Sequence, residues 1–295
     1  MKTIFQRSLA VAIILSITAL TMDDSAEGAR CIYVTAPVNS VNQSATGKYA
    51  SVNGLKIYYE VHGSQAMDHP LVLLHGAFGF ADAWAPVLPA LSKSHQVIAI
   101  ELEGHGHTRD LDRPLSYQQM AEDTAALLRQ LKIKDADLFG YSMGGVVALR
   151  IAIRHPELVR KLAILGSSTL AIKDAFEPEN YKQFQSIPDE FAPPILKIPY
   201  DKIAPDPTRW PVLVKKIRNM GNEFKGYPEA EVKTIKAKTL IMQGDRDVVR
   251  PEHAIELFRL ISNAQLAIFP GSDHFIMSTG PDKVLEALVP FLDAP

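Results

Sequence analysis

The sequence lacks the features typical of disulfide-bonded, nucleic-acid-binding, metal-binding and nucleotide-binding proteins. Its 295 residues include one cysteine, Cys31, so no disulfide can form within the chain. The 31 basic and 33 acidic residues nearly balance, and the formal net charge of −2 gives no electrostatic preference for nucleic acid. No Walker pattern, G-x-G-x-x-G run, H-E-x-x-H motif or paired cysteines are present. We therefore expect no nucleic-acid partner, no metal and no organic cofactor.

Long apolar runs are also missing. A membrane-spanning helix needs roughly 20 apolar residues, and the uncharged stretch at residues 9–20 is shorter than that. Lys2 and Arg7 precede this stretch, and small residues suited to a signal peptidase follow at 26–28. The pattern predicts a secretory signal peptide at residues 1–28 and a polar linker at 29–47. We expect a secreted or periplasmic protein with no stable membrane insertion after the signal is removed.

The remaining sequence alternates between strand and helix patterns. With 47% hydrophobic residues, the chain can bury a large core. Asn53-Gly54 is a strong turn signal and predicts a hairpin between residues 49–52 and 56–61. Short apolar runs typical of buried parallel strands follow, at residues 71–74, 96–100, 136–139, 161–165, 238–242 and 265–269. Helical patterns at residues 117–131 and 281–292 complete an α/β class with a mostly parallel sheet and helices on both faces.

One interval interrupts this alternation. No good strand pattern occurs between Ser168 and Val232, and nine of the chain's twenty prolines fall there. We predict a helical lid at residues 169–232, inserted between two parts of the core at 48–168 and 233–295. The interval holds eight aromatic residues, some of which we expect to line an apolar pocket: Phe176, Tyr181, Phe184, Phe191, Tyr200, Trp210, Phe224 and Tyr227.

The most informative motif is Gly-Tyr-Ser-Met-Gly at residues 140–144. It follows the apolar run at 136–139 and opens a helical pattern of small residues at 145–149. A serine held at a tight turn between strand and helix projects its hydroxyl above the sheet edge, next to the positive end of the helix. This context predicts Ser142 as a nucleophile rather than an ordinary turn residue.

A serine nucleophile needs a histidine base and an acid that orients the histidine. Both residue types follow later strands. Asp245 and Asp247 stand in the loop after residues 238–242, and His274 stands in the loop after residues 265–269. The chain order serine, aspartate, histidine is the one that accompanies this type of turn. The residues themselves leave Asp245 and Asp247 as competing acids.

Together these motifs resemble the α/β-hydrolase superfamily, in particular its serine esterase, cofactor-free haloperoxidase and carbon-carbon hydrolase branch. The resemblance covers about residues 48–293. It implies the α/β-hydrolase fold with an inserted helical lid, and a catalytic triad of Ser142, Asp247 and His274. The family's acid usually ends a G-x-x-D pattern, which here begins at Gly244 and selects Asp247 over Asp245.

The resemblance also implies two backbone donors for an oxyanion. The apolar run at 71–74 leads into His75-Gly76, the turn that supplies one of the family's donors. The implied donors are the N–H groups of Ala77 and Met143. Phe78 is the second choice for the first donor, because the sequence does not fix the turn.

The sequence departs from the family pattern at two places. The residue before His274 is commonly glycine and here is Asp273, whose charge could perturb the imidazole. The family's Asp-x-x-Gly-x-Gly-x-Ser is altered to Glu-Leu-Glu-Gly-His-Gly-His-Thr at residues 101–108.

His105, His107 and Asp110 look like a metal cluster, but Arg109 occupies the place of a metal ligand and disfavours a divalent cation there.

These observations predict a serine hydrolase that cleaves a small ester with an apolar acyl or aryl group through an acyl-enzyme. The same triad could instead act as a lactonase, a carbon-carbon bond hydrolase or a perhydrolase. An alternative of another class is a non-catalytic small-molecule receptor on the same fold. Each of these takes a small molecule as its partner. Serine at position 142 argues against dehalogenase and epoxide hydrolase chemistry, in which the family uses aspartate.

Overall fold

The computed structural model describes residues 47–64, 69–188, 191–192 and 194–295. The predicted signal peptide and all but the last residue of the predicted linker lie outside the described residues. The strands are β1 (Lys48–Val52), β2 (Leu55–His62), β3 (Leu71–Leu74), β4 (Val97–Ile100), β5 (Ala136–Tyr141), β6 (Val159–Leu165), β7 (Lys238–Gly244) and β8 (Ala264–Phe269). Each of the eight strand predictions is confirmed, with shifts of one or two residues at the ends.

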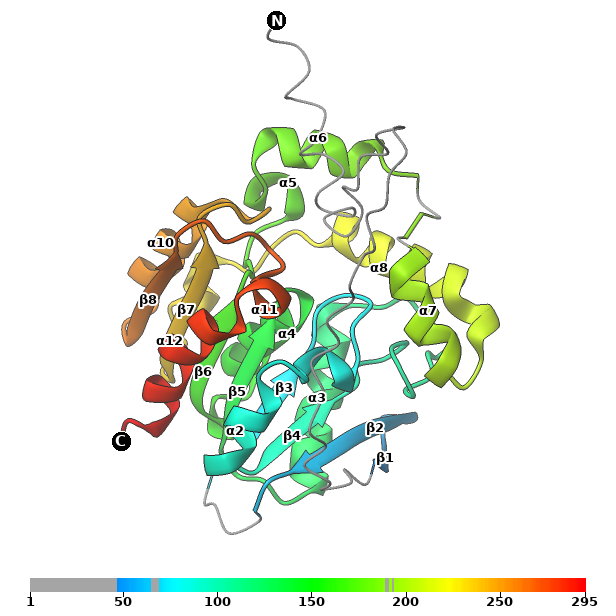
Figure 1. Cartoon of the computed structure of the whole chain (residues 1–295), viewed down its shortest axis with the longest axis horizontal. Coiled ribbons are helices and arrows are strands. Elements are labelled where there is room, and N and C mark those ends of the chain that lie inside the picture. Colours follow the sequence, from blue (N-terminus) through cyan, green and yellow to red (C-terminus); the bar gives the residue numbers. More distant parts are fainter. Residues whose placement is uncertain (1–46, 65–68, 189–190, 193) are drawn as a thin grey trace, which may run out of the picture.

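The strands form one sheet in the order β1-β2-β4-β3-β5-β6-β7-β8 (Figure 1). The predicted hairpin pairs Val52 with Leu55 around the Asn53-Gly54 turn, and β2 is antiparallel to β4. All other neighbouring strands are parallel, so β3 and β5 to β8 end at the same edge of the sheet. Loops that follow these strands therefore meet at one edge.

Helices cover both faces of the sheet, as predicted. The helices of the described residues are α2 (Leu88–Ser94), α3 (Tyr117–Gln130), α4 (Met143–Arg154), α5 (Ile172–Ala175), α6 (Pro178–Ser186), α7 (Pro194–Ile203), α8 (Trp210–Glu223), α9 (Glu229–Val232), α10 (Pro251–Leu260), α11 (Ile276–Thr279) and α12 (Pro281–Asp293), with short 3₁₀ turns η1 (Ala81–Trp84), η2 (Pro156–Leu158) and η3 (Pro207–Arg209). Alternate residues of β3 illustrate the two layers. Val72 and Leu74 join one buried cluster with α3 and α4, whereas Leu71 and Leu73 join another with α12.

The interval between β6 and β7 is helical, as the sequence predicted. It contains α5 to α9, and its described residues form only an isolated bridge, between Phe176 and Val249. Figure 1 shows α5 and α6 at the top of the molecule and α7 and α8 at its right side. We call residues 169–232 the insertion.

The aromatic residues of the insertion lie in separate groups. Phe176 contacts Phe184, Tyr200 contacts Trp210, and Phe224 contacts Tyr227, with ring centroids 5.0 to 6.0 Å apart. Phe191, in contrast, is 43% exposed. The insertion is therefore not built around a single aromatic core.

Candidate active site

The turn at Ser142 joins β5 directly to α4. Ser142 has φ 54° and ψ −121°, a conformation that non-glycine residues rarely adopt. Glycines flank it because there is no room for a Cβ atom. A Cβ on Gly140 would lie 2.5 Å from the Gly144 carbonyl oxygen, and one on Gly144 would lie 1.9 Å from the Leu74 carbonyl oxygen. The strained turn is thus held by close backbone packing between β5, α4 and the end of β3.

The structure brings Ser142, Asp247 and His274 together. His274 Nε2 lies 2.9 Å from Ser142 Oγ, and His274 Nδ1 lies 2.8 Å from Asp247 Oδ1. Because an ionised carboxylate only accepts hydrogen bonds, Nδ1 carries the proton and Nε2 presents its lone pair to the serine hydroxyl. Asp245, the competing acid, instead accepts the N–H of Ser272 at 3.2 Å. The geometry favours Asp247 over Asp245 as the partner of the histidine.

The surroundings of His274 favour its protonated form. Burial lowers the pKa of His274, but the charge of Asp247 and the hydrogen bond to it, together with the charge of Asp273, raise the pKa above its ordinary value. Asp273 is fixed because its Oδ1 accepts the N–H of Phe275 at 2.9 Å. Asp273, which replaces the glycine common in the family, therefore places a fixed negative charge beside the imidazole.

The predicted oxyanion donors belong to two segments next to Ser142. Met143 is the first residue of α4, where backbone N–H groups have no partner within the helix. The other donor belongs to a turn closed by a 3.0 Å hydrogen bond from Gly79 N–H to the Gly76 carbonyl. This turn contains both Ala77, the predicted donor, and Phe78, the second choice. A Cβ on Gly76 would lie 3.2 Å from Ser142 Cβ, so the turn packs against the serine.

Sequence reasoning missed two residues that shape this site. Gly166, at the end of β6, has φ 59°, and a Cβ there would lie 2.9 Å from Asp247 Oδ2 and 3.1 Å from His274 Nδ1. A larger residue would push the acid and histidine apart. Tyr141 donates its hydroxyl to the carbonyl of His274 at 2.5 Å. The glycine at a strand end was a visible signal for the first, whereas nothing in the sequence linked Tyr141 to residue 274.

Two buried groups support the turn at residues 76–79. His75 accepts the Leu102 N–H at Nε2, at 3.1 Å, so Nδ1 carries a proton and donates to the Gly76 carbonyl at 2.8 Å. Burial lowers the pKa of His75 to about 3, so it stays neutral. Glu101, which replaces the family's aspartate, accepts the N–H groups of Ala81 and His107. Glu101 therefore ties the segment after the turn to the loop at residues 101–108.

The residues that resembled a metal cluster have other partners. His105 Nδ1 lies 3.0 Å from the Glu103 carbonyl, His107 pairs with Glu101, and Asp110 pairs with Arg209 and Lys216. Across the described ranges, no group of three or more His, Cys, Asp or Glu side chains is arranged to hold a metal ion. Nor does any described helix combine the length and apolar character that crossing a bilayer requires.

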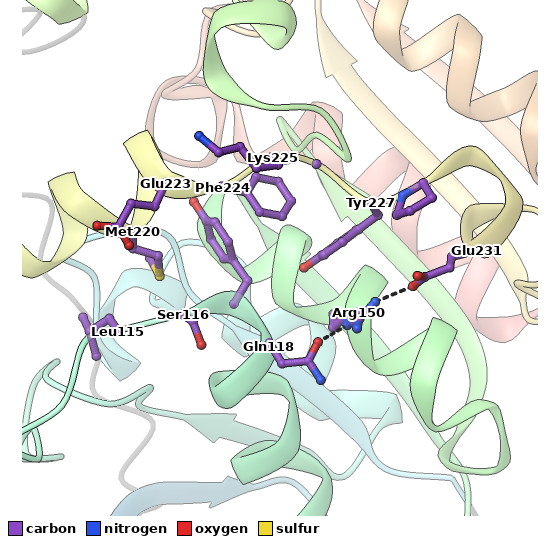
Figure 2. A pocket seen from close by; sticks show the side chains of 13 residues that line it. Leu115, Ser116, Gln118, Arg150, Met220, Glu223, Phe224, Lys225, Tyr227 and Glu231 are labelled. Atoms are coloured by element: carbon purple, nitrogen blue, oxygen red, sulfur yellow. Dashed lines mark hydrogen bonds and ion pairs between the residues drawn. The ribbon is translucent and has the colours of Figure 1, made fainter.

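A cavity of about 420 Å³ lies between α3, α4 and the end of the insertion. Arg150 lies at its wall and donates to Gln118 and Glu231 (Figure 2). The Tyr227 hydroxyl donates to the Val146 carbonyl at 3.1 Å, which joins this region to the first turns of α4. Neither Ser142 nor His274 is among the residues that line it, so this cavity is separate from the candidate active site.

The sequence profile of the Alpha/beta hydrolase family matches residues 71–287, which is more than half of the chain. The chain belongs to the α/β-hydrolase family. Human serine hydrolase BPHL is 27% identical over 251 residues, covering 81% of this chain and 83% of BPHL. The 2-hydroxymuconate semialdehyde hydrolase of Pseudomonas sp. strain CF600 is 29% identical over 227 residues, covering 70% of this chain and 80% of that protein.

Solved structures show the same fold. The enol-lactonase from Burkholderia xenovorans LB400 superposes with a TM-score of 0.68 at 24% identity, covering 84% of this chain and all of that chain. A meta-cleavage product hydrolase from Pseudomonas fluorescens IP01 superposes with a TM-score of 0.69 at 23% identity, covering 84% of this chain and 97% of that chain. These matches and the sheet order confirm the predicted α/β-hydrolase fold.

Proposed function

We propose that this α/β-hydrolase-family enzyme is a serine hydrolase that cleaves a small carboxylic ester with an apolar acyl or aryl group. One observation carries the proposal: His274 hydrogen-bonds Ser142 Oγ through one ring nitrogen and Asp247 through the other. A serine hydroxyl is a weak nucleophile at neutral pH, and this arrangement removes its proton as it attacks.

In the acylation step, Ser142 Oγ bonds to the ester carbonyl carbon while its proton passes to His274 Nε2. The carbonyl π electrons move onto the oxygen, which the N–H groups of Ala77 and Met143 stabilise. When the carbonyl reforms, the bond to the alcohol oxygen breaks, and His274 returns its proton to that oxygen. Asp247 keeps the imidazole oriented and stabilises its positive charge during both transfers.

Deacylation repeats these steps with water. His274 takes a proton from the water, the hydroxide bonds to the acyl carbon, and Ser142 Oγ leaves with the proton that His274 returns. Neither of these two half-reactions requires a metal or an organic cofactor. The negative charges of Asp247 and Asp273, which raise the pKa of His274, stabilise the imidazolium that forms in each half of the cycle.

The relatives support hydrolysis more broadly than they support one substrate. They include proteins named for hydrolysis of a semialdehyde, a carbamate and an enol-lactone. The alternatives to ester cleavage are therefore lactone, carbamate and carbon-carbon bond hydrolysis with the same triad. We favour an ester over a carbamate or a carbon-carbon bond, because the triad and two backbone donors suffice for it without further substrate activation. A lactone is a cyclic ester, so open-chain ester and lactone are distinguished by experiment.

A panel of substrates tests the proposal. Purified protein is assayed with p-nitrophenyl esters of increasing acyl length, aryl esters and lactones, with the Ser142→Ala variant as the matched control. The proposal expects the highest kcat/KM on a short or aryl ester and loss of that activity in the control. Faster turnover of a lactone would transfer the function to lactonase, and tight binding without turnover would favour a receptor.

We also propose that the protein is exported. The support is the predicted signal peptide at residues 1–28, which lies outside the described residues. Mature protein recovered from its host is expected to begin after about residue 28, as read by N-terminal sequencing. A first residue of Met1 would contradict export by signal cleavage.

A further inference from the structure

The turn at residues 76–79 contains a residue of unexpected type. Phe78 has φ 62°, in the left-handed region that favours glycine or asparagine at such a turn position. A bulky residue there is strained, so contacts of its side chain must compensate. The Phe78 ring contacts the Trp210 ring, with centroids 5.4 Å apart and an interplanar angle of 47°. The insertion thus contacts the turn that carries the proposed oxyanion donor.

Trp210 is held firmly where it meets this turn. Its side chain is 5% exposed, and Tyr200 packs against it with ring centroids 5.1 Å apart. The preceding residue, Arg209, donates Nε and Nη2 to the two carboxylate oxygens of Asp110, each at 2.5 Å. Lys216, on the same helix as Trp210, donates to Asp110 at 2.7 Å. One buried carboxylate therefore anchors the start of α8 through two cations.

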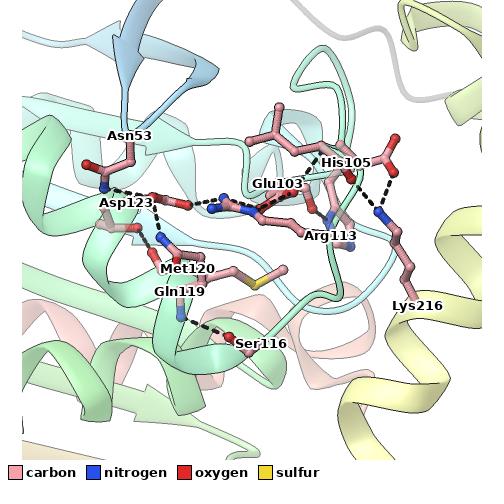
Figure 3. Close-up of polar contacts among 12 residues, drawn as sticks. Asn53, Glu103, His105, Arg113, Ser116, Gln119, Met120, Asp123 and Lys216 are labelled. Carbon is pink, nitrogen blue, oxygen red and sulfur yellow. Dashed lines mark hydrogen bonds and ion pairs between the residues drawn. The ribbon is translucent and has the colours of Figure 1, made fainter.

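Asp110 is itself part of a rigid core loop. The neighbouring Leu111 N–H donates to Glu103 at 2.9 Å, and Glu103 pairs with Arg113. Arg113 also pairs with Asp123 of α3 at 2.7 Å. Figure 3 shows this chain of contacts running from α3 through Arg113 and Glu103 toward Lys216 on α8. The position of Trp210 is therefore fixed by contacts with the core as well as by contacts within the insertion.

We propose that Trp210 is a positioning residue for the oxyanion turn, with Asp110 as its anchor. The contact between Trp210 and Phe78 holds the strained turn so that the Ala77 N–H faces the oxygen that becomes negative beside Ser142. This inference rests on the proposed function. Hydrogen bonds to a developing oxyanion act mainly in the transition state, so a displaced donor lowers kcat more than it changes KM.

The first test compares Trp210→Ala with Trp210→Phe. Complete loss of one oxyanion donor elsewhere costs about 10²–10³ in kcat, so a misdirected turn is expected to cost about tenfold. Trp210→Ala should lower kcat about tenfold on the best p-nitrophenyl ester, with KM little changed. Affinity for a boronic acid, which mimics the tetrahedral oxyanion, should fall by a similar factor. Trp210→Phe keeps an aromatic contact and should recover most of the loss.

Controls separate positioning from general damage to the insertion. Phe191→Ala removes an exposed aromatic of the same insertion and should leave kcat and inhibitor affinity unchanged. Thermal unfolding of each variant identifies loss of folded protein. Asp110→Asn retains Trp210 but weakens both ion pairs, and it should reproduce part of the kcat loss.

A double-mutant cycle tests the contact itself. Phe78→Gly removes the ring while tolerating the positive φ, and its defect should match that of Trp210→Ala. If the two residues act through their contact, the double variant loses no more than the larger single loss. Multiplicative losses, or a Trp210→Ala effect confined to KM, would overturn the inference. Hydrolysis that survives Ser142→Ala would instead overturn the proposed function, so the two failures are distinguishable.

Discussion

The carboxyl edge of the sheet and the insertion between β6 and β7 differ in how tightly their residues are fixed. At the edge, side chains from three loops meet through hydrogen bonds of 2.8 and 2.9 Å, and neighbouring glycines have no room for a Cβ. In the insertion, α6 has no buried residue, and Ile195 and Ile198 of α7 are 43% and 56% exposed. We infer that bond cleavage depends on the tightly fixed edge and on Trp210, which is 5% exposed, whereas α6 and α7 can vary to change the substrate.

The largest effect is expected at Ser142, on the rigid side of this comparison. Ser142→Ala should lower kcat by about 10⁶-fold, as removal of a serine nucleophile does elsewhere, because no other group can form the acyl-enzyme. Steady-state kinetics on the best ester measures the loss, and circular dichroism checks that folding is unchanged. A variant that keeps more than a tenth of the activity would show that Ser142 is not the nucleophile.

The next effect distinguishes the two aspartates of one loop. Asp247→Asn should lower kcat by about 10⁴-fold, because an amide no longer holds His274 in the required tautomer. Asp245→Asn is the matched control and should be mild, since among the described residues the Asp245 carboxylate accepts the Ser272 N–H and not the His274 N–H. Kinetics of both variants under identical conditions decides between them. A larger loss at position 245 would transfer the acid's role there.

Apart from Trp210, whose contact with Phe78 is expected to affect kcat, the aromatics of the insertion are expected to control substrate preference rather than rate. Each methylene buried is worth about 0.8 kcal/mol, so space for two more should shift chain-length preference by roughly tenfold. Alanine is substituted singly for each aromatic of the insertion, and kcat/KM is measured on a series of p-nitrophenyl esters. At least one buried aromatic should change the rank order, whereas exposed Phe191 should not. An unchanged order in every variant would place specificity in the core loops and leave the insertion without a lid function.

A smaller effect is expected from the charge beside the imidazole. Asp273 contributes to the raised pKa of His274, and catalysis needs the neutral imidazole as base. Activity therefore rises as pH increases through this pKa. Asp273→Asn removes the charge and should move the rising limb of the pH dependence of kcat/KM to lower pH. A limb that stays in place, or moves upward, would show that Asp273 does not tune the base.

Much of the rigid edge could be predicted from the sequence, because local signals determine it. We could predict which loops meet from the turn at 140–144, the strand patterns and the chain order of serine, aspartate and histidine. The family pattern then favoured Asp247 over Asp245. In the described structure Asp247 hydrogen-bonds His274, whereas Asp245 accepts the Ser272 N–H. The hydrogen bond from the Tyr141 hydroxyl to the His274 carbonyl could not be predicted, because no sequence pattern links these two residues.

The insertion was predictable only in outline. Prolines and the absence of strand patterns indicated helices, but they did not predict which aromatic side chains contact one another. The contact between Phe78 and Trp210 and the anchoring of Arg209 by Asp110 depend on tertiary packing between distant segments. Such contacts leave no periodic pattern in the sequence. Which insertion residues reach the candidate active site therefore required the structure.

Covalent labelling tests the central claim most directly. The full-length protein and the Ser142→Ala variant are treated with a fluorophosphonate, which reacts with an activated serine, and are analysed by intact mass and peptide mapping. The account predicts one adduct on Ser142 in the unmodified sequence, loss of esterase activity in proportion to labelling, and no adduct in the variant. Labelling at another residue, or full esterase activity in the labelled protein, would contradict the assignment of Ser142, His274 and Asp247 as the hydrolytic site.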